Sequence, residues 1–235
     1  MPHLRLLLLT AFLILGVSFC SLSDTNEPAV NDNGTTYLAL GDSYTIGEGT
    51  ETHERWPVLL TDTMTLSGSN TGSPKIIART GWTTSELKAG IEDAAPEGPF
   101  DLVSLLIGVN NQYRGVSRGY THDGYREEFL ELLNIAIDMA GGSAGRVFVV
   151  SIPDYSVTPF VNEENKKRVS EEIDIFNEIN RQIADSLNVI YFDITPISRL
   201  AATDRQLLAP DNLHPSGKMY KMWVELMIDD ILKML

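Results

Sequence analysis

From Thr35 to the C-terminus, short apolar runs alternate with longer amphipathic segments, and this alternation constrains the fold more than any other feature of the sequence. The short runs are bounded by glycine, proline and polar residues, which is typical of strands, whereas the long segments repeat apolar residues at helical spacing. Strands that alternate with helices form a parallel sheet with helices on its faces. We therefore predict a single α/β domain over residues 35–235, with five strands and an α/β/α layered architecture.

The predicted strands are Tyr37–Leu40, Lys75–Arg79, Leu102–Ile107, Arg146–Ile152 and Val189–Phe192. The predicted helices are Trp56–Leu66, a helix that opens at the capping box Thr83–Glu86, Tyr125–Ala140, Glu163–Leu187 and Ser216–Leu235. The third strand is apolar at every position except Ser104, as expected of a strand buried on both faces. In the fourth helix the apolar residues fall on one face, which indicates a long amphipathic helix packed on the sheet.

The charge balance limits the classes of partner. The chain has 18 Lys and Arg against 32 Asp and Glu, a net charge of −14, and no dense basic run. A protein that follows a phosphate backbone needs clustered basic residues. We therefore expect no nucleic-acid partner, and the acidity disfavours polyanionic substrates.

Residues 1–20 have the pattern of an export signal, in which Arg5 precedes the apolar stretch Leu6–Leu15. This stretch is too short to span a bilayer, which takes about 20 apolar residues. Cys20 is the only cysteine, so no internal disulfide can form. Its position resembles that of the lipidated cysteine of a bacterial lipoprotein, although Phe19 stands where a small residue is usual.

Two forms of export stay open at this point. Either Cys20 is lipidated and tethers the protein to a membrane, or a plain secretory signal is cut near Ser23. Both predict an exported protein, periplasmic or membrane-anchored, in which residues 21–34 form a polar linker.

Three loops that follow successive predicted strands carry residues suited to catalysis. Gly41–Thr45 follows the first strand and contains Ser43, Thr80–Trp82 follows the second, and Gly108–Asn111 follows the third. Parallel sheets bind their ligands at the carboxyl ends of the strands, where these loops lie. Near the C-terminus, Asp211–Pro215 supplies an acid and an imidazole three residues apart.

A serine hydroxyl becomes a strong nucleophile only when a base takes its proton, and His214 is the candidate base for Ser43. Asp211 is the candidate that accepts a hydrogen bond from the other imidazole nitrogen and fixes the tautomer. The other histidines lie in the signal or lack an acid at useful spacing. We therefore predict that Ser43, Asp211 and His214 are catalytic.

Together these four motifs resemble the GDSL, or SGNH, hydrolase family, whose motifs supply a serine, a glycine, an asparagine and an Asp-x-x-His pair in this order. The resemblance covers residues 35–235 and implies a flavodoxin-like sheet with strand order 2-1-3-4-5. It also implies an oxyanion hole made of the backbone amides of Ser43 and Gly81 and the side-chain amide of Asn110. The implied activity is that of a carboxylic ester hydrolase, esterase-like or lysophospholipase-like.

The sequence departs from the family pattern at two positions. Tyr44 replaces the leucine that gives the GDSL motif its last letter, and we expect this change to affect packing more than chemistry. Asn111 stands where the family often has an aspartate, so we expect the support of Asn110 to differ here.

Several other polar residues are interpreted as structural. Gly141–Gly145 matches the G-x-S-x-G motif of α/β-hydrolases, but that motif works only on a turn from strand to helix. Because Ser143 follows a predicted helix and precedes a strand, we predict that it lies at the opposite edge of the sheet. Asp154 and Asp193 follow the fourth and fifth strands as single carboxylates. No histidine or cysteine pattern has metal-ligand spacing, so we predict no metal and no cofactor.

The functional prediction is an exported serine hydrolase that cleaves small acyl esters through an acyl-enzyme on Ser43. The alcohol part is left open between a carbohydrate and a lysophospholipid. Several residues of the flanking loops are able to contact a sugar or to serve in packing: Tyr113, Arg114, Tyr120 and Tyr155. Two alternatives remain, an acyltransferase that uses the same triad and a non-catalytic glycan- or lipid-binding module on the same fold.

Overall fold

The computed structural model describes residues 34–115 and 121–235, and within them a five-stranded parallel sheet has the order β2-β1-β3-β4-β5. Its strands are β1 (Tyr37–Gly41), β2 (Lys75–Ala78), β3 (Leu102–Leu106), β4 (Val147–Val150) and β5 (Ile190–Phe192). All four strand pairings are parallel. The α/β class predicted from the sequence and the strand order implied by the family resemblance are thereby confirmed.

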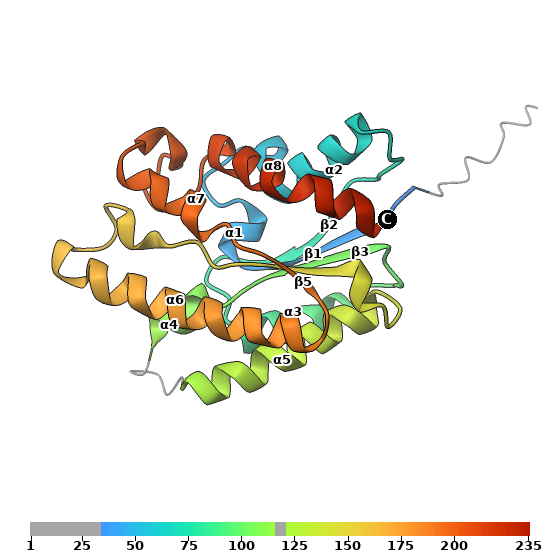
Figure 1. The fold of residues 1–235 in the computed structure, drawn as a ribbon, viewed down its shortest axis with the longest axis horizontal. Coiled ribbons are helices and arrows are strands. Elements are labelled where there is room, and N and C mark those ends of the chain that lie inside the picture. The colour runs from blue at the N-terminus through green and yellow to red at the C-terminus, as the bar shows by residue number, and fades with distance from the viewer. Residues whose placement is uncertain (1–33, 116–120) are drawn as a thin grey trace, which may run out of the picture. The chain divides into compact units, whose positions relative to one another are not determined.

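Helices cover both faces of the sheet (Figure 1). One face carries α1 (Ser43–Ile46), α2 (Trp56–Leu66), α7 (Thr195–Arg199) and α8 (Gly217–Met234). The other carries α3 (Thr84–Ala94), α4 (Val109–Arg114), α5 (His122–Met139) and α6 (Glu163–Ser186). Short 3₁₀ turns complete the chain at Thr52–Glu54, Ala144–Arg146, Tyr155–Val157 (η4), Leu200–Ala202 and Arg205–Leu207.

The centre of the sheet is the most buried part of the fold. Every residue of β1 and β3 is buried, whereas the edge strands β2 and β5 are buried only in part. A strand with helices on both faces has no solvated side, which explains why β3 is apolar at every position except Ser104, whose hydroxyl bonds to that of Tyr37. Because β1 lies between β2 and β3, the loops that follow these three strands are neighbours in space.

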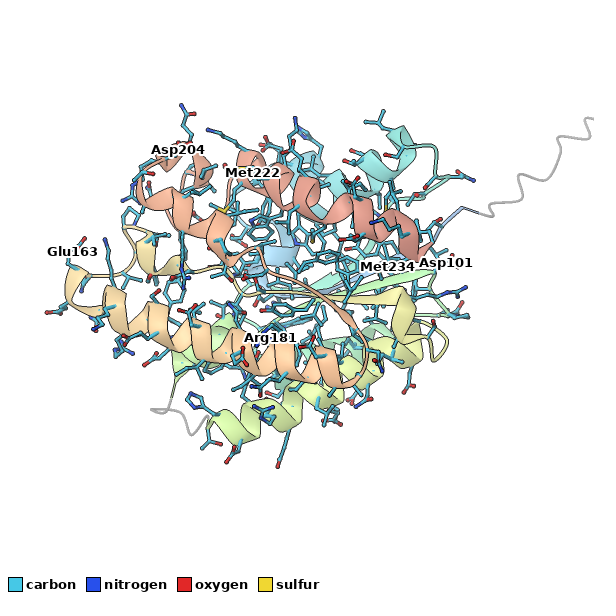
Figure 2. All side chains as sticks on the ribbon, viewed as in Figure 1. Asp101, Glu163, Arg181, Asp204, Met222 and Met234 are labelled. Carbon is cyan, nitrogen blue, oxygen red and sulfur yellow. The ribbon has the colours of Figure 1, made fainter. Side chains whose placement is uncertain are left out.

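The long helix α6 shows how the amphipathic pattern is used. Val169, Ile173 and Phe176 are buried on its inner face, and Glu163 and Arg181 are exposed along its length (Figure 2). Burial of such an apolar stripe, rather than helix propensity alone, stabilises a helix of this kind.

The predicted strands and long helices agree with the structure within three residues at each end. The largest difference is at α5, which begins at His122 rather than Tyr125 because the hydroxyl of Thr121 accepts from the amide of Gly124 and caps the helix. Three short helices, α1, α4 and α7, were not predicted. Two of them carry predicted site residues, which the sequence placed in loops.

The predicted signal (residues 1–20) and nearly all of the predicted linker (residues 21–34) lie outside the described residues, and so does Tyr120. The export and lipidation of the chain therefore stay predictions. Within residues 34–115 and 121–235, no helix is long and apolar enough to cross a membrane.

Candidate active site

A cavity of about 140 Å³ contains four of the five predicted site residues. It is lined by Ser43, Tyr44, Thr80, Gly81, Val109, Asn110, Tyr113, Tyr155, Phe160, Leu213 and His214. The fifth predicted residue, Asp211, contacts His214 and does not line the cavity itself. The loops after β1, β2 and β3 and the loop before α8 therefore converge as the motif order implied.

Ser43 is the first residue of α1, immediately after β1. The chain turns sharply here, and a Cβ on Gly41 would lie 2.2 Å from the hydroxyl oxygen of Thr45, so only glycine fits. The carboxylate of Asp42 accepts from the amide of Tyr44 at 3.0 Å and caps α1. As the first residue of the helix, Ser43 has a backbone N–H with no acceptor inside the helix.

The Asp42 carboxyl next to the nucleophile is electrostatically costly. Its side chain is fully buried, and its Oδ2 atom has no hydrogen-bond partner among the described residues. Burial disfavours the charged form and raises the pKa of Asp42 to about 7, despite the opposing hydrogen bond from the Tyr44 amide. The turn that presents Ser43 therefore contains an uncompensated acid.

His214 and Asp211 form a tight pair. Nδ1 of His214 lies 2.6 Å from Oδ2 of Asp211, and the backbone amides of Leu213 and His214 donate to Oδ1 at 2.9 and 3.0 Å. Burial raises the pKa of Asp211, but the hydrogen bonds from His214 and the two amides outweigh it and lower the pKa below its usual value. Asp211 is therefore held as a carboxylate, which orients the imidazole through Nδ1 and leaves Nε2 without a hydrogen-bond partner among the described residues.

Tyr44 packs against this imidazole. Its ring is buried, its centroid lies 5.4 Å from that of His214, and the two rings meet edge to face. The hydroxyl of Tyr220, in α8, donates to the carbonyl of Tyr44 at 3.0 Å. The departure from the GDSL leucine thus affects packing, and this packing positions His214.

Gly81 and Asn110 bring two further polar groups to the cavity. Gly81 has a φ of +85°, which a residue with a side chain adopts only with strain. The side-chain amide of Asn110 donates to the carbonyl of Trp82 at 3.0 Å, which fixes its orientation. Since an amide nitrogen carries two hydrogens, the second one stays available to a ligand.

The comparisons with known proteins agree with this geometry. The model of the GDSL-like lipase/acylhydrolase family matches residues 39–222, a range that includes all four motifs. The chain belongs to this family. It is therefore a carboxylic ester hydrolase of the GDSL type. A search of curated proteins finds no match.

Solved structures share the GDSL fold at low sequence identity. TesA has a TM-score of 0.66 at 16% identity, over 86% of this chain and 100% of TesA. The esterase EstA from Pseudoalteromonas has a TM-score of 0.60 at 21% identity, over 85% and 97% of the two chains. A variant of Axe2, an acetyl-xylooligosaccharide esterase from Geobacillus, has a TM-score of 0.66 at 18% identity, over 84% and 95%. At these identities the similarity shows the fold alone.

The structure also reveals contacts that hold the GDSL motifs together and that the sequence did not identify. Asn111 is fully buried, and its side chain accepts from the amide of Thr84 at 3.1 Å and donates to the Thr84 hydroxyl at 2.6 Å. Arg114 donates to the carbonyl of Gly81 and forms an ion pair with Glu86 at 3.0 Å. These contacts hold α4 against the start of α3. Asn111, which stands where the family often has an aspartate, therefore has a structural role.

The sequence named Arg114 as a residue that contacts a sugar or serves in packing, and the structure places it one helical turn after Asn110 in α4. Its partners Gly81 and Glu86 are about 30 residues away, and no periodicity of a single sequence identifies such a pairing. Arg114 is a positioning residue, because it bonds to the carbonyl of Gly81 while Asn110 bonds to that of Trp82.

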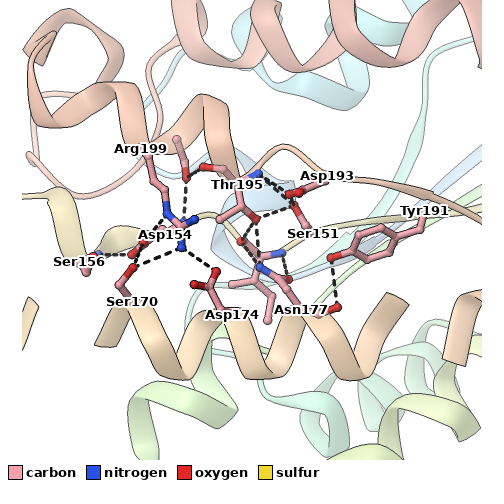
Figure 3. A network of polar contacts seen from close by, with 12 residues as sticks. Ser151, Asp154, Ser156, Ser170, Asp174, Asn177, Tyr191, Asp193, Thr195 and Arg199 are labelled. Atoms are coloured by element: carbon pink, nitrogen blue, oxygen red, sulfur yellow. Dashed lines mark hydrogen bonds and ion pairs between the residues drawn. The ribbon is translucent and has the colours of Figure 1, made fainter. Parts of the chain in front are cut away.

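The polar residues after β4 and β5 are hydrogen-bonded to one another, in contrast to those that line the cavity (Figure 3). Asp154 accepts from Arg199 at 2.9 Å and from the hydroxyl of Ser170 at 2.6 Å, and Asp193 accepts from the amide of Thr195 at 3.0 Å. The interpretation of both aspartates as structural agrees with these contacts. Ser143 lies between α5 and β4. It therefore lies at the amino-terminal ends of the strands, whereas Ser43 lies at their carboxyl ends.

Metal binding is a separate question at this site. Within residues 34–115 and 121–235, no cluster of three or more histidine, cysteine or acidic side chains is placed to hold a metal ion. The absence of a metal or other cofactor stays a prediction for the working enzyme.

Proposed function

We propose that the protein hydrolyses small acyl esters through an acyl-enzyme on Ser43, with His214 as the base and Asp211 as its orienting acid. One observation carries the proposal: Ser43, Gly81, Asn110 and His214 line the same cavity, while Nδ1 of His214 lies 2.6 Å from Asp211. A nucleophile, a paired imidazole and a set of amide donors are the parts that acyl transfer requires.

In the first half of the reaction the hydroxyl oxygen of Ser43 attacks the ester carbonyl carbon. Nε2 of His214 takes the hydroxyl proton, because Nδ1 is already bonded to Asp211. The amides of Ser43, Gly81 and Asn110 donate to the oxyanion of the tetrahedral intermediate. The carbon–oxygen bond to the alcohol then breaks, and His214 returns the proton to the departing alcohol.

In the second half a water molecule attacks the acyl carbon and gives its proton to His214. The bond between the acyl carbon and the Ser43 oxygen breaks, and Ser43 recovers its proton as the carboxylic acid leaves. No cofactor enters either half. The alcohol and the acid are thus released in separate steps, which predicts a burst of alcohol when the second half is slow.

The dimensions of the cavity favour a short acyl group. Its volume of about 140 Å³ is close to that of an engineered protein cavity that holds one benzene molecule, about 150 Å³. Val109 and Leu213 supply apolar surface to it. A long acyl chain would have to leave this cavity, so acetate and similar esters are the best candidates.

The test uses 4-nitrophenyl acetate and three variants. Ser43→Ala and His214→Ala are each expected to lower kcat by about 10⁴-fold or more. The matched control is Ser143→Ala, which removes a hydroxyl at the opposite edge of the sheet and should keep full activity. Circular dichroism checks that all three variants fold. Wild-type turnover by Ser43→Ala, or its loss in Ser143→Ala, would refute the proposal.

A further inference from the structure

A second and larger cavity adjoins the catalytic one. Its volume is about 660 Å³, which is within the range of sites for small organic ligands. Tyr113, Tyr155 and Phe160 line both cavities. The larger cavity is otherwise lined mainly by residues of α4 and α6 and of the segment that joins η4 to α6.

The three shared residues form an aromatic cluster. The centroid of Tyr113 lies 6.3 Å from that of Tyr155 and 5.8 Å from that of Phe160. Tyr113 is 58% exposed and Phe160 is 50% exposed, although both pack against a buried tyrosine. Single exposed apolar residues are ordinary, but two contacting aromatic rings that line both cavities offer a flat surface to a ligand.

A chain of hydrogen bonds runs along the wall of the larger cavity. The hydroxyl of Tyr155 donates to the side-chain oxygen of Gln112 at 2.8 Å, and the amide of Gln112 donates to Glu172 at 2.7 Å. Arg168 donates to the other oxygen of Glu172 at 2.9 Å and to Asn165 at 3.3 Å. These contacts hold planar polar groups in fixed positions before any ligand arrives.

The charges on this wall are balanced. Arg168 is paired with Glu172, and Arg114 is paired with Glu86. A phosphate group would have to compete with a carboxylate for either arginine, and the chain as a whole carries a charge of −14. A neutral hydroxyl group meets no such competition, because it donates to and accepts from the unused positions of the paired groups.

The wall also has apolar surface, supplied by Val161, Val169 and Phe176. The alcohol part of a lysophospholipid is a glycerophosphodiester, so the group that distinguishes it from a sugar is its phosphate. Sugars combine apolar ring faces with hydroxyl groups, so they match an aromatic surface beside planar polar side chains. Because both arginines of this wall are already paired with carboxylates, the wall favours a neutral sugar over an alcohol that carries a phosphate.

We propose that the larger cavity binds the alcohol part of the substrate and that this part is a neutral, hydroxyl-rich carbohydrate. The enzyme is then a deacylase of O-acylated sugars, with the acyl group in the 140 Å³ cavity and the sugar in the 660 Å³ cavity. This inference rests on the proposed function, because it takes Ser43 as the point of attack.

The test compares kcat/KM on three kinds of ester: mono-O-acetylated methyl glycosides of a pentose and a hexose, 4-nitrophenyl acetate and a lysophosphatidylcholine. The variants are Asn165→Ala and Arg168→Ala. Lys167→Ala is the matched control, since Lys167 is the neighbouring cation on α6 and does not line the cavity. Each test variant should lower the ratio of glycoside to 4-nitrophenyl acetate kcat/KM at least fivefold, mainly through KM, and the control should change it less than twofold.

The possible failures are distinguishable. If 4-nitrophenyl acetate is cleaved through Ser43 but the lysophospholipid is preferred to both glycosides, the carbohydrate inference is wrong and the proposed function stands. The same conclusion follows if neither test variant changes the ratio. If no ester is turned over in a manner that depends on Ser43, both proposals are wrong.

Discussion

Two buried aspartates lie beyond the carboxyl ends of strands of the sheet, Asp42 after β1 and Asp154 after β4. Their surroundings differ sharply. Each accepts a hydrogen bond from the backbone amide two residues further on, at 3.0 Å for Asp42 and 2.9 Å for Asp154. The second oxygen of Asp154 also accepts from Arg199 and Ser170, whereas that of Asp42 has no partner among the described residues.

The pKa values of the two groups move in opposite directions. Burial raises the pKa of both, but the hydrogen bonds from Ser156, Ser170 and Arg199 outweigh it at Asp154 and lower its pKa. At Asp42 burial prevails, and the pKa rises to about 7. After β4 and β5 the polar side chains bond to one another, whereas Ser43, Gly81 and Asn110, which follow β1, β2 and β3, line the smaller cavity. Unsatisfied or strained groups of this kind are typical of functional sites.

The largest expected effect comes from changing the acid that contacts the catalytic imidazole, Asp211, which lies in the loop before α8. Asp211→Asn keeps an oxygen for the amides of Leu213 and His214 but no longer holds the correct imidazole tautomer. We expect kcat to fall about 10³- to 10⁴-fold, because the same change in a serine protease triad costs about 10⁴. Stopped-flow or steady-state hydrolysis of 4-nitrophenyl acetate measures this, and a loss of less than tenfold would exclude Asp211 from the triad.

The second test removes one predicted hydrogen-bond donor of the oxyanion hole, the side-chain amide of Asn110. Asn110→Ala deletes the side-chain amide that faces the cavity and should lower kcat about 10²- to 10³-fold. KM should change far less, because the donor acts on the oxyanion. The control is Asn134→Ala, which removes an exposed amide on α5. Equal kinetics for the two variants would contradict the role of Asn110.

A change in the network around Asp154 is expected to lower the stability of the fold rather than the catalytic rate. Asp154→Asn removes the charge that pairs with Arg199 inside a buried network, which should lower the free energy of unfolding by about 2 to 3 kcal/mol. Urea titration measures this, with the exposed Asp229→Asn as control. The activity of the folded fraction should stay within about threefold of wild type. A large loss of kcat with unchanged stability would show that Asp154 takes part in catalysis.

The last expected effect is the pH dependence of stability contributed by Asp42. Because its pKa is raised on folding, the folded state gives up this proton less readily than the unfolded state, and stability is lost as pH rises from about 4 to 7. Asp42→Asn keeps the cap on α1 and should remove most of this loss. Urea midpoints at pH 4.5 and pH 8 measure it, and an unchanged difference between the two pH values would contradict a raised pKa.

The sequence predicted the layers and the positions of the four motifs, and the family resemblance implied the strand order. The long amphipathic helices could be predicted because α6 has 24 residues and α5 and α8 have 18 each, enough to repeat the helical period several times. The helices α1 and α4 have four and six residues, too few to show a period, so Ser43 and Asn110 were placed in loops. The site residues themselves were found because their spacing within each motif is short.

The contacts that connect distant segments could not be predicted. Arg114 meets Gly81 and Glu86 because two loops become neighbours in the sheet, and no local pattern encodes that approach. The same holds for the larger cavity, whose wall combines Gln112 with Glu172, 60 residues apart. The reaction type and the site residues could therefore be predicted from the motifs. The preferred substrate depends on segments that come together only in the folded chain.

The most direct test of the central claim is covalent labelling by a fluorophosphonate, followed by peptide mapping with mass spectrometry. The serine oxygen displaces fluoride and becomes a phosphonate ester, a reaction that needs an activated hydroxyl. The account predicts one adduct, on the peptide that contains Ser43, absent in Ser43→Ala and strongly reduced in His214→Ala. An adduct on Ser143, or a folded enzyme that takes no label, would contradict it.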